Sequence, residues 1–184
     1  MKIAVMQPYI FPYIGYFQLM NHVDKFIFYD DVTFIKKGWI NRNKLLLNGN
    51  SFMFTVPIVN ASQNTLIKDI KVAIDTRWKN KFYKTIEFAY KKTPFYNEIM
   101  SIICQVIDLR TKYLKDIHLI SFELIVKYTG LETIIVDSSS VYNNDDLNGQ
   151  NRIIDICIKE QATQYVNLYG GKKLYNHDEF NKKK

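Results

Sequence analysis

Short apolar runs that stop at polar or glycine-containing segments recur along the chain and predict buried strands. These runs cover residues 2–6, 25–29, 132–136 and 164–168. Between the first two, residues 15–21 predict a short helix, and the prolines before it exclude a regular helix or central strand there. Strand, loop, helix and strand within about thirty residues indicate a βαβ unit.

Helical periodicity dominates the rest of the chain, where apolar side chains recur three or four positions apart at 76–91, 96–109, 112–128 and 150–159. Residues 45–59 differ, because two apolar runs flank an Asn-Gly turn, which favours a β-hairpin. The alternation at 67–74 predicts a further strand.

We therefore expect a single α/β domain over residues 1–181, with a mainly parallel, Rossmann-like sheet flanked by helices. Within it, residues 45–75 form a hairpin and strand insertion, and residues 182–184 form a basic tail.

The net charge of the chain favours anionic partners. Its 184 residues include 25 Lys and Arg and 18 Asp and Glu, which give a formal net charge of +7. A basic surface suits an anionic small molecule such as a nucleotide sugar. The absence of a nucleic-acid-binding motif argues against nucleic acid. No apolar stretch reaches the ~20 residues of a membrane span, and Gln7 and Pro8 interrupt the first apolar run, unlike in a signal peptide. We expect a cytoplasmic protein whose two cysteines are reduced, and its oligomeric state is left open.

Polar residues follow each predicted strand, at the edge where open parallel sheets collect ligands. The candidate substrate-binding residues after the first strand are Gln7, Pro8, Tyr9, Tyr13, Gly15 and Tyr16. Pro-Tyr-Ile-Gly-Tyr at 12–16 is similar to the Pro-His-x-Gly-His of nucleotidyl-transferring enzymes, whose glycine lets a nucleotide approach the backbone. Tyrosine can donate a hydrogen bond to phosphate but carries no positive charge. A turn followed by a packed aromatic helix explains the pattern equally well.

Asp30 and Asp31 follow the second strand and are the candidate catalytic residues, as a general base or as ligands of a hydroxyl, an ammonium or Mg²⁺. The alternative is that one of them only caps a loop, and we expect function for one of the pair. The later strands are followed by three more groups of candidate substrate-binding residues, namely Ser138, Asn167 and the pair Gly170 and Gly171.

The densest polar and aromatic cluster is Trp39, Asn41, Arg42 and Asn43. Arg42 suits phosphate or carboxylate, the asparagines can orient a ligand, and Trp39 offers a stacking face; an exposed loop entering the hairpin is the alternative. No metal-ligand spacing or nucleophile triad is present in the sequence, and no cofactor is indicated.

The chain resembles the WbqC-like family of bacterial proteins at residues 1–17, 30–32, 39–43 and 165–175, and more weakly at 90–95 and 138–139. Members typically occur in O-antigen and other surface-polysaccharide gene clusters, and some are labelled glycine or acyl transferases acting on amino sugars. The resemblance implies a transferase that modifies an amino sugar or nucleotide-linked sugar by aminoacyl or acyl transfer; a non-catalytic accessory protein of such a pathway is the alternative. Many relatives have His where this chain has Met6, so a His at that position cannot be a universal catalyst. Relatives usually continue beyond the Gly-Gly segment with another strand-rich segment, and the sequence leaves open whether this chain is a shortened form.

Overall fold

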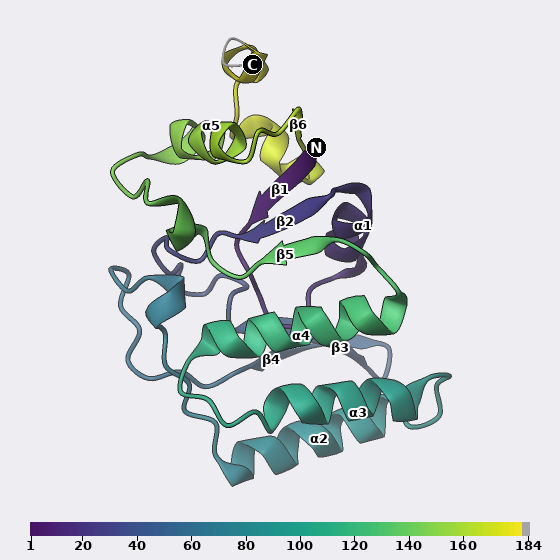
Figure 1. Ribbon diagram of the computed structural model, residues 1–184. Coiled ribbons are helices and arrows are strands. Elements are labelled where there is room, and N and C mark those ends of the chain that lie inside the picture. Colours follow the sequence, from purple (N-terminus) through teal and green to yellow (C-terminus); the bar gives the residue numbers. More distant parts are fainter. Residues whose placement is uncertain (182–184) are drawn as a thin grey trace. The chain divides into compact units, whose positions relative to one another are not determined.

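The computed structural model describes residues 1–181 (Figure 1); the predicted basic tail at 182–184 lies outside the described residues. The chain forms two compact units. Unit 1 comprises residues 1–8, 12–32 and the chain from 129 onward, and unit 2 comprises residues 9–11 and 33–128. Most of unit 2 is thus inserted between the second and third strands of the unit 1 sheet.

Unit 1 is built on a four-stranded parallel sheet, which confirms the predicted α/β class. Its strands are β1 (Lys2–Met6), β2 (Lys25–Phe28), β5 (Ile134–Val136) and β6 (Gln164–Tyr165). They lie in the order β5-β2-β1-β6, and all three pairings are parallel. The middle strands β1 and β2 are apolar and almost wholly buried, as expected for strands covered on both faces.

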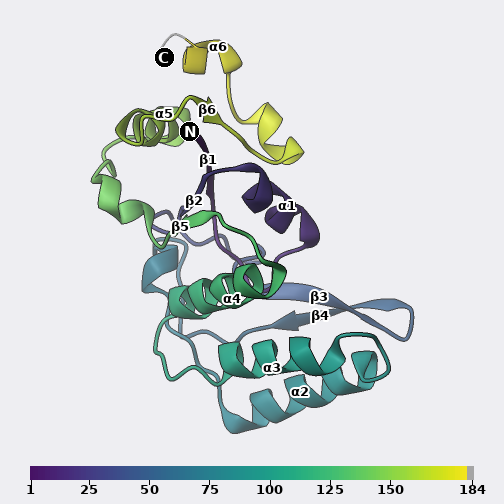
Figure 2. The same cartoon turned by 45° about the vertical axis from the view of Figure 1, so that its right-hand side comes forward.

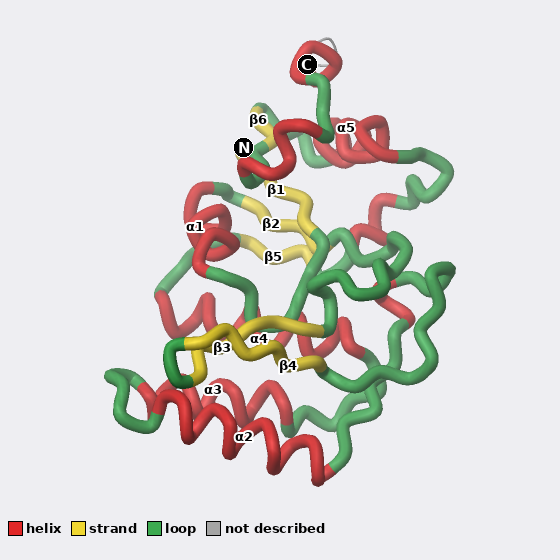
Figure 3. Tube along the Cα trace, turned by 180° about the vertical axis from the view of Figure 1, so that it is seen from behind, coloured by secondary structure: helices red, strands yellow, loops and turns green. Residues whose placement is uncertain are grey.

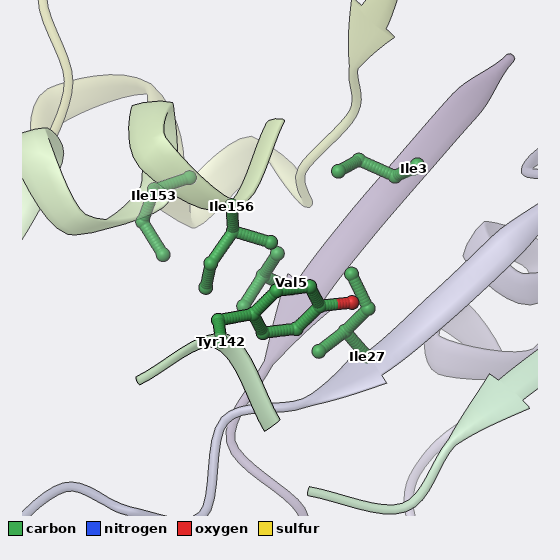
Figure 4. Packing of buried hydrophobic residues seen from close by; sticks show 6 residues of the cluster. All are labelled: Ile3, Val5, Ile27, Tyr142, Ile153 and Ile156. Carbon is green, nitrogen blue, oxygen red and sulfur yellow. The ribbon is translucent and has the colours of Figure 1, made fainter. Parts of the chain in front are cut away.

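Helices α1 (Ile14–His22) and α5 (Gly149–Lys159) cover opposite faces of this sheet (Figure 2), because successive strand side chains point to opposite sides. On one face, Ile3, Val5 and Ile27 pack with Tyr142, Ile153 and Ile156 (Figure 4). On the other face, the ring of Tyr16 from α1 lies 6.1 Å from that of Phe26. The remaining elements of unit 1 are η2 (Ser139–Tyr142), η3 (Tyr169–Lys173) and α6 (His177–Asn181).

Unit 2 contains the predicted hairpin, formed by β3 (Arg42–Leu47) and β4 (Asn50–Thr55). Asn48 and Gly49 between them both have positive φ, as a two-residue hairpin turn requires. Three helices complete the unit: α2 (Thr76–Tyr90), α3 (Tyr96–Ile107) and α4 (Leu114–Thr129). The hairpin packs on α2 (Figure 3), where the ring centroids of Phe54 and Phe82 are 4.9 Å apart.

Three details of unit 2 differ from the sequence prediction. Residues 67–74 do not form a strand; a 3₁₀-helix, η1 (Ile67–Asp69), buries Ile67 and Ile70 at a spacing of three, the period of that helix. Phe88, one of the apolar residues at helical spacing over 76–91, does not pack inward with Phe82 and Ile86 and is 71% exposed. Arg42 and Asn43, which precede the hairpin predicted over residues 45–59, begin strand β3. Among residues 1–181, no helix combines the length and the hydrophobicity that crossing a bilayer requires.

Candidate functional site

The adjacent strands β1 and β6 send the chain to opposite faces of the unit 1 sheet. After β1 the chain forms α1 on one face. After β6, Tyr175 and Phe180 pack on the cluster beneath α5, and the rings of Phe180 and Tyr165 stack at 5.3 Å. This is a topological switch point, and in open α/β sheets ligands bind in the crevice outside the carboxyl ends of such a strand pair.

Asn167 organises the chain that leaves β6. Its Nδ2 donates to the Tyr165 hydroxyl at 3.0 Å, and its Oδ1 accepts from the Leu168 amide at 2.7 Å. Burial raises the pKa of Tyr165 well above its ordinary value, so this phenol stays protonated. A Cβ on Gly171 would lie 2.5 Å from Nδ2 of Asn167, whereas a Cβ on Gly170 would meet nothing within 4 Å. Gly171 is therefore required by the packing of Asn167, and Gly170 leaves open space beside the backbone.

Gln7, Pro8 and the start of α1 form the β1 side of this edge. The Tyr16 hydroxyl donates to the Gln7 carbonyl at 2.9 Å, which ties the end of β1 to the helix. Tyr13 is exposed, and its ring meets that of Tyr16 edge-on at 6.0 Å. A Cβ on Gly15 would lie 2.2 Å from the Tyr13 ring. The space beside Gly15 that the sequence motif reserves for a nucleotide thus holds the ring of Tyr13.

Asp31, directly after β2, is held in a buried ion pair. Arg152 of α5 donates to its carboxylate through Nη2 at 2.5 Å and faces its carbonyl oxygen through Nη1 at 3.4 Å. The Ser139 hydroxyl donates to the other carboxylate oxygen. Arg152 is 4% exposed; its Nε donates to Asn144 at 2.9 Å, and its guanidinium lies 5.2 Å from the Tyr29 ring centroid. Asp31 therefore joins β2 to α5 and to the segment after β5.

Asp30 is only 1% exposed and accepts a hydrogen bond from the Ser138 hydroxyl at 2.7 Å. The hydroxyls of Ser138 and Ser140 are 2.9 Å apart. Ser138 is half-buried, and its hydroxyl also accepts a hydrogen bond from the Ser140 amide at 3.2 Å. The two predicted catalytic carboxylates thus have separate hydrogen-bond partners.

The asparagines of the predicted polar cluster bind backbone carbonyls within unit 2. Asn41 donates through Nδ2 to the Val56 carbonyl at 2.9 Å. Asn43 donates to the carbonyls of Ile10 at 3.0 Å and Phe11 at 2.6 Å, where Phe11 has φ of 45°. Asn43 therefore fixes the segment of residues 9–11, which includes the predicted binding residue Tyr9.

Trp39 is exposed and lies close to two cations of β3. The guanidinium of Arg42 is 5.8 Å and the ammonium of Lys44 is 5.7 Å from its ring centroid. Nε of Arg42 also donates to the Gly38 carbonyl at 2.7 Å, which sets the direction of the guanidinium. Gln7 and Asp30 belong to unit 1, whereas Trp39 and Arg42 belong to unit 2.

Sequence reasoning missed Arg152 and Ser139. Arg152 directly precedes the inward-facing Ile153 in a predicted amphipathic helix. This position lies at the border of the apolar face, where a solvent-exposed side chain is the ordinary expectation. The available signal was the acidic pair itself, because a buried carboxylate requires a cation, and the helix predicted after the third strand offers Arg152 beside its apolar face.

The other titratable groups that sequence analysis could consider are structural. His118 is fully buried in α4; its Nε2 donates to the Ile40 carbonyl at 2.8 Å, and burial lowers its pKa to about 4. Cys104 and Cys157 are free thiols, and burial raises the pKa of Cys157 to about 11. Within residues 1–181, no three His, Cys, Asp or Glu side chains gather closely enough to hold a metal ion.

Comparison with known proteins agrees with the resemblance seen in the sequence. The model of the WbqC-like protein family matches residues 7–184. The uncharacterized protein Rv1507c of Mycobacterium tuberculosis (strain ATCC 25618 / H37Rv) is 28% identical over 174 residues, which are 90% of this chain and 71% of that protein. No solved structure matches the chain. The matched range begins directly after β1 and includes the other three strands of the sheet, and the chain belongs to the WbqC-like protein family.

Proposed function

We propose that this protein is a transferase of surface-polysaccharide assembly that binds a nucleotide-linked sugar at the carboxyl edge of the unit 1 sheet. The transfer places an acyl or aminoacyl group, such as glycyl, on an amino sugar. The observation that carries the proposal is the switch point between β1 and β6, where parallel α/β sheets bind nucleotides. Two further features support the same substrate class. The chain resembles a family whose members typically occur in surface-polysaccharide gene clusters, and its net charge of +7 suits a diphosphate.

Each side of the crevice contributes a different contact in this proposal. Tyr13, exposed at the first turn of α1, offers a phenol to a phosphate oxygen. Gly170 leaves the backbone after β6 open to close approach, and Asn167 is already oriented by Tyr165 and Leu168. Asn167 is the residue we expect to contribute most to affinity, because its rotamer is fixed before the ligand arrives.

Acyl transfer to an amine also needs a group that takes the amine proton. We assign this role to Asp30, acting through the hydroxyl of Ser138 that it orients at 2.7 Å. Asp31 is then a positioning residue, since Arg152 and Ser139 occupy its two oxygens.

A specific observation also favours the second candidate, an accessory protein that binds the sugar without turnover. Asp30 is almost completely buried and Asp31 is committed to its ion pair. A site whose two candidate catalytic carboxylates are both buried suits binding more readily than proton transfer. The two candidates share the ligand and differ in whether a product forms.

Calorimetry with UDP-, GDP- and dTDP-linked amino sugars tests the binding claim. We expect at least one of these nucleotide sugars to bind. Asn167→Ala should lower its affinity roughly tenfold or more, because the variant loses a hydrogen bond to a charged group. Asn151→Ala, an exposed asparagine on α5, is the matched control and should bind as the unaltered protein does. Equal affinities of the two variants, or no binding by any of these nucleotide sugars, would refute the site.

Mass spectrometry of the bound sugar, incubated with acyl and glycyl donors, then separates the candidates. A mass increase that is lost in Ser138→Ala supports the transferase. Binding without any mass change supports the accessory role.

A further inference from the structure

A shallow groove of about 810 Å³ runs along helix α2 in unit 2. One wall is the face of α2 between Thr76 and Phe88, and Leu47 at the end of β3 contributes the other side. The volume lies within the range of small-molecule sites. Thirteen helical residues extend over about 20 Å, so the groove fits an elongated ligand.

Three cations line this groove. Arg77, Lys81 and Lys84 are spaced four and three residues apart, which places them on one helix face about 6 and 4.5 Å apart along the axis. None of them forms an ion pair within the part of the chain that the structure describes. The acid within α2, Glu87, is engaged by Lys91 at 2.7 Å. This hydrogen bond is the main cause of the lowered pKa of Glu87, and the charge of Lys84 makes a smaller contribution. The groove therefore has three cations in a row and no acidic lining residue.

The other lining groups show which kind of anion fits. Asn80 lies between Arg77 and Lys81, and Thr76 and Thr85 flank the row, so that neutral hydrogen-bonding groups stand beside the cations. The Thr85 hydroxyl donates to the Lys81 carbonyl at 2.9 Å and can still accept a hydrogen bond. Phe88 closes the row with a ring that is 71% exposed. Neutral hydroxyl and amide groups match sugar hydroxyls, an exposed ring matches the apolar face of a sugar, and the cations match phosphate or carboxylate substituents.

A nucleic acid strand fits these lining groups less well. Single-stranded nucleic acid is usually held by several aromatic rings, one for each stacked base, and Phe88 is the aromatic residue among the groove's described lining. An apolar peptide helix would bury three unpaired cations.

We infer that this groove binds an anionic oligosaccharide, a short sugar chain that carries phosphate or carboxylate groups. The inference is independent of the nucleotide-sugar site, because every lining residue belongs to unit 2 and the proposed crevice belongs to unit 1.

Two triple variants with equal charge test the groove. Arg77→Gln/Lys81→Gln/Lys84→Gln changes the groove, and Lys92→Gln/Lys112→Gln/Lys127→Gln changes three exposed lysines of unit 2 that do not line it. Each lowers the net charge from +7 to +4, since three positive charges are removed. Binding of hexagalacturonate, phosphorylated maltohexaose, neutral maltohexaose and a mixed 12-nucleotide DNA is measured by calorimetry at low salt.

We expect one or both acidic sugars to bind and the neutral sugar not to bind. Affinity should fall at least tenfold in the groove variant and less than threefold in the control. Phe88→Ala changes an exposed side chain and leaves all cations in place, and it should lower the affinity for the acidic sugar at least threefold. Equal losses in the two triple variants would show that net charge alone attracts the ligand. Tighter, groove-dependent binding of DNA, or no binding of either acidic sugar, would also overturn the inference.

Discussion

Replacing Arg152 tests the most buried electrostatic contact beside the candidate site. The side chains of Arg152 and Asp31 are 5% and 6% exposed, so Arg152→Met would leave Asp31 as a buried carboxylate without its cation. Breaking such a pair from one side costs roughly 3–5 kcal/mol. At about 2–4 °C per kcal/mol for a chain of this length, the melting temperature should fall by roughly 6–20 °C.

Calorimetric and urea unfolding of four proteins measure this effect: the unaltered protein, Arg152→Met, Asp31→Asn and the double variant. The double variant should be more stable than the sum of the single changes implies, because it leaves no uncompensated charge. Lys159→Met is the matched control on the same helix; its partly exposed pair with Asp155 should contribute below about 1 kcal/mol. If Arg152→Met costs no more than Lys159→Met, the buried network does not hold β2 to α5.

The remaining predictions concern three other structural features. Burial lowers the pKa of His118 to about 4, so between pH 6.5 and 4 the unfolded chain binds a proton at this histidine and the folded chain does not. The free energy of unfolding should therefore drop by up to about 3 kcal/mol as the pH falls through this window. In urea titrations, His118→Gln should remove that part of the pH dependence. Gly171→Ala should displace Asn167 and lower stability by roughly 1–2 kcal/mol, whereas Gly170→Ala, with open space at its Cβ, should change it by less than about 0.5 kcal/mol in the same assay. Asn43→Ala should cost roughly 1–3 kcal/mol because the carbonyls of Ile10 and Phe11 lose their donor, and faster hydrogen exchange in the peptide covering residues 9–11 would report the loss; unchanged exchange there would contradict the role given to Asn43.

The positions of the central strands could be predicted because burial on both faces of a sheet leaves a continuous apolar run. Residues 2–6 and 25–29 show this pattern, and both became central strands of the sheet. The segment 67–74 was misread because Ile67 and Ile70 are buried by a 3₁₀ turn, whose spacing over a few residues is hard to distinguish from alternation.

The site residues were harder to interpret because a polar residue at a strand end can bind either a ligand or the protein itself. Asp31, Asn41 and Asn43 carry the side chains expected of a ligand site, yet their polar atoms bond to Arg152 or to backbone carbonyls. Those partners lie up to 121 residues away in sequence. Gly171 shows the same difficulty, since its small size serves the packing of Asn167. Spacing along one chain does not reveal such contacts.

Hydrogen exchange of the protein with and without a bound nucleotide sugar tests the central claim most directly. Binding at the β1–β6 switch point should slow exchange in two peptides together, one covering residues 12–17 and the other covering 166–171. Protection of other segments alone, with these two unchanged at saturating ligand, would contradict the placement of the site.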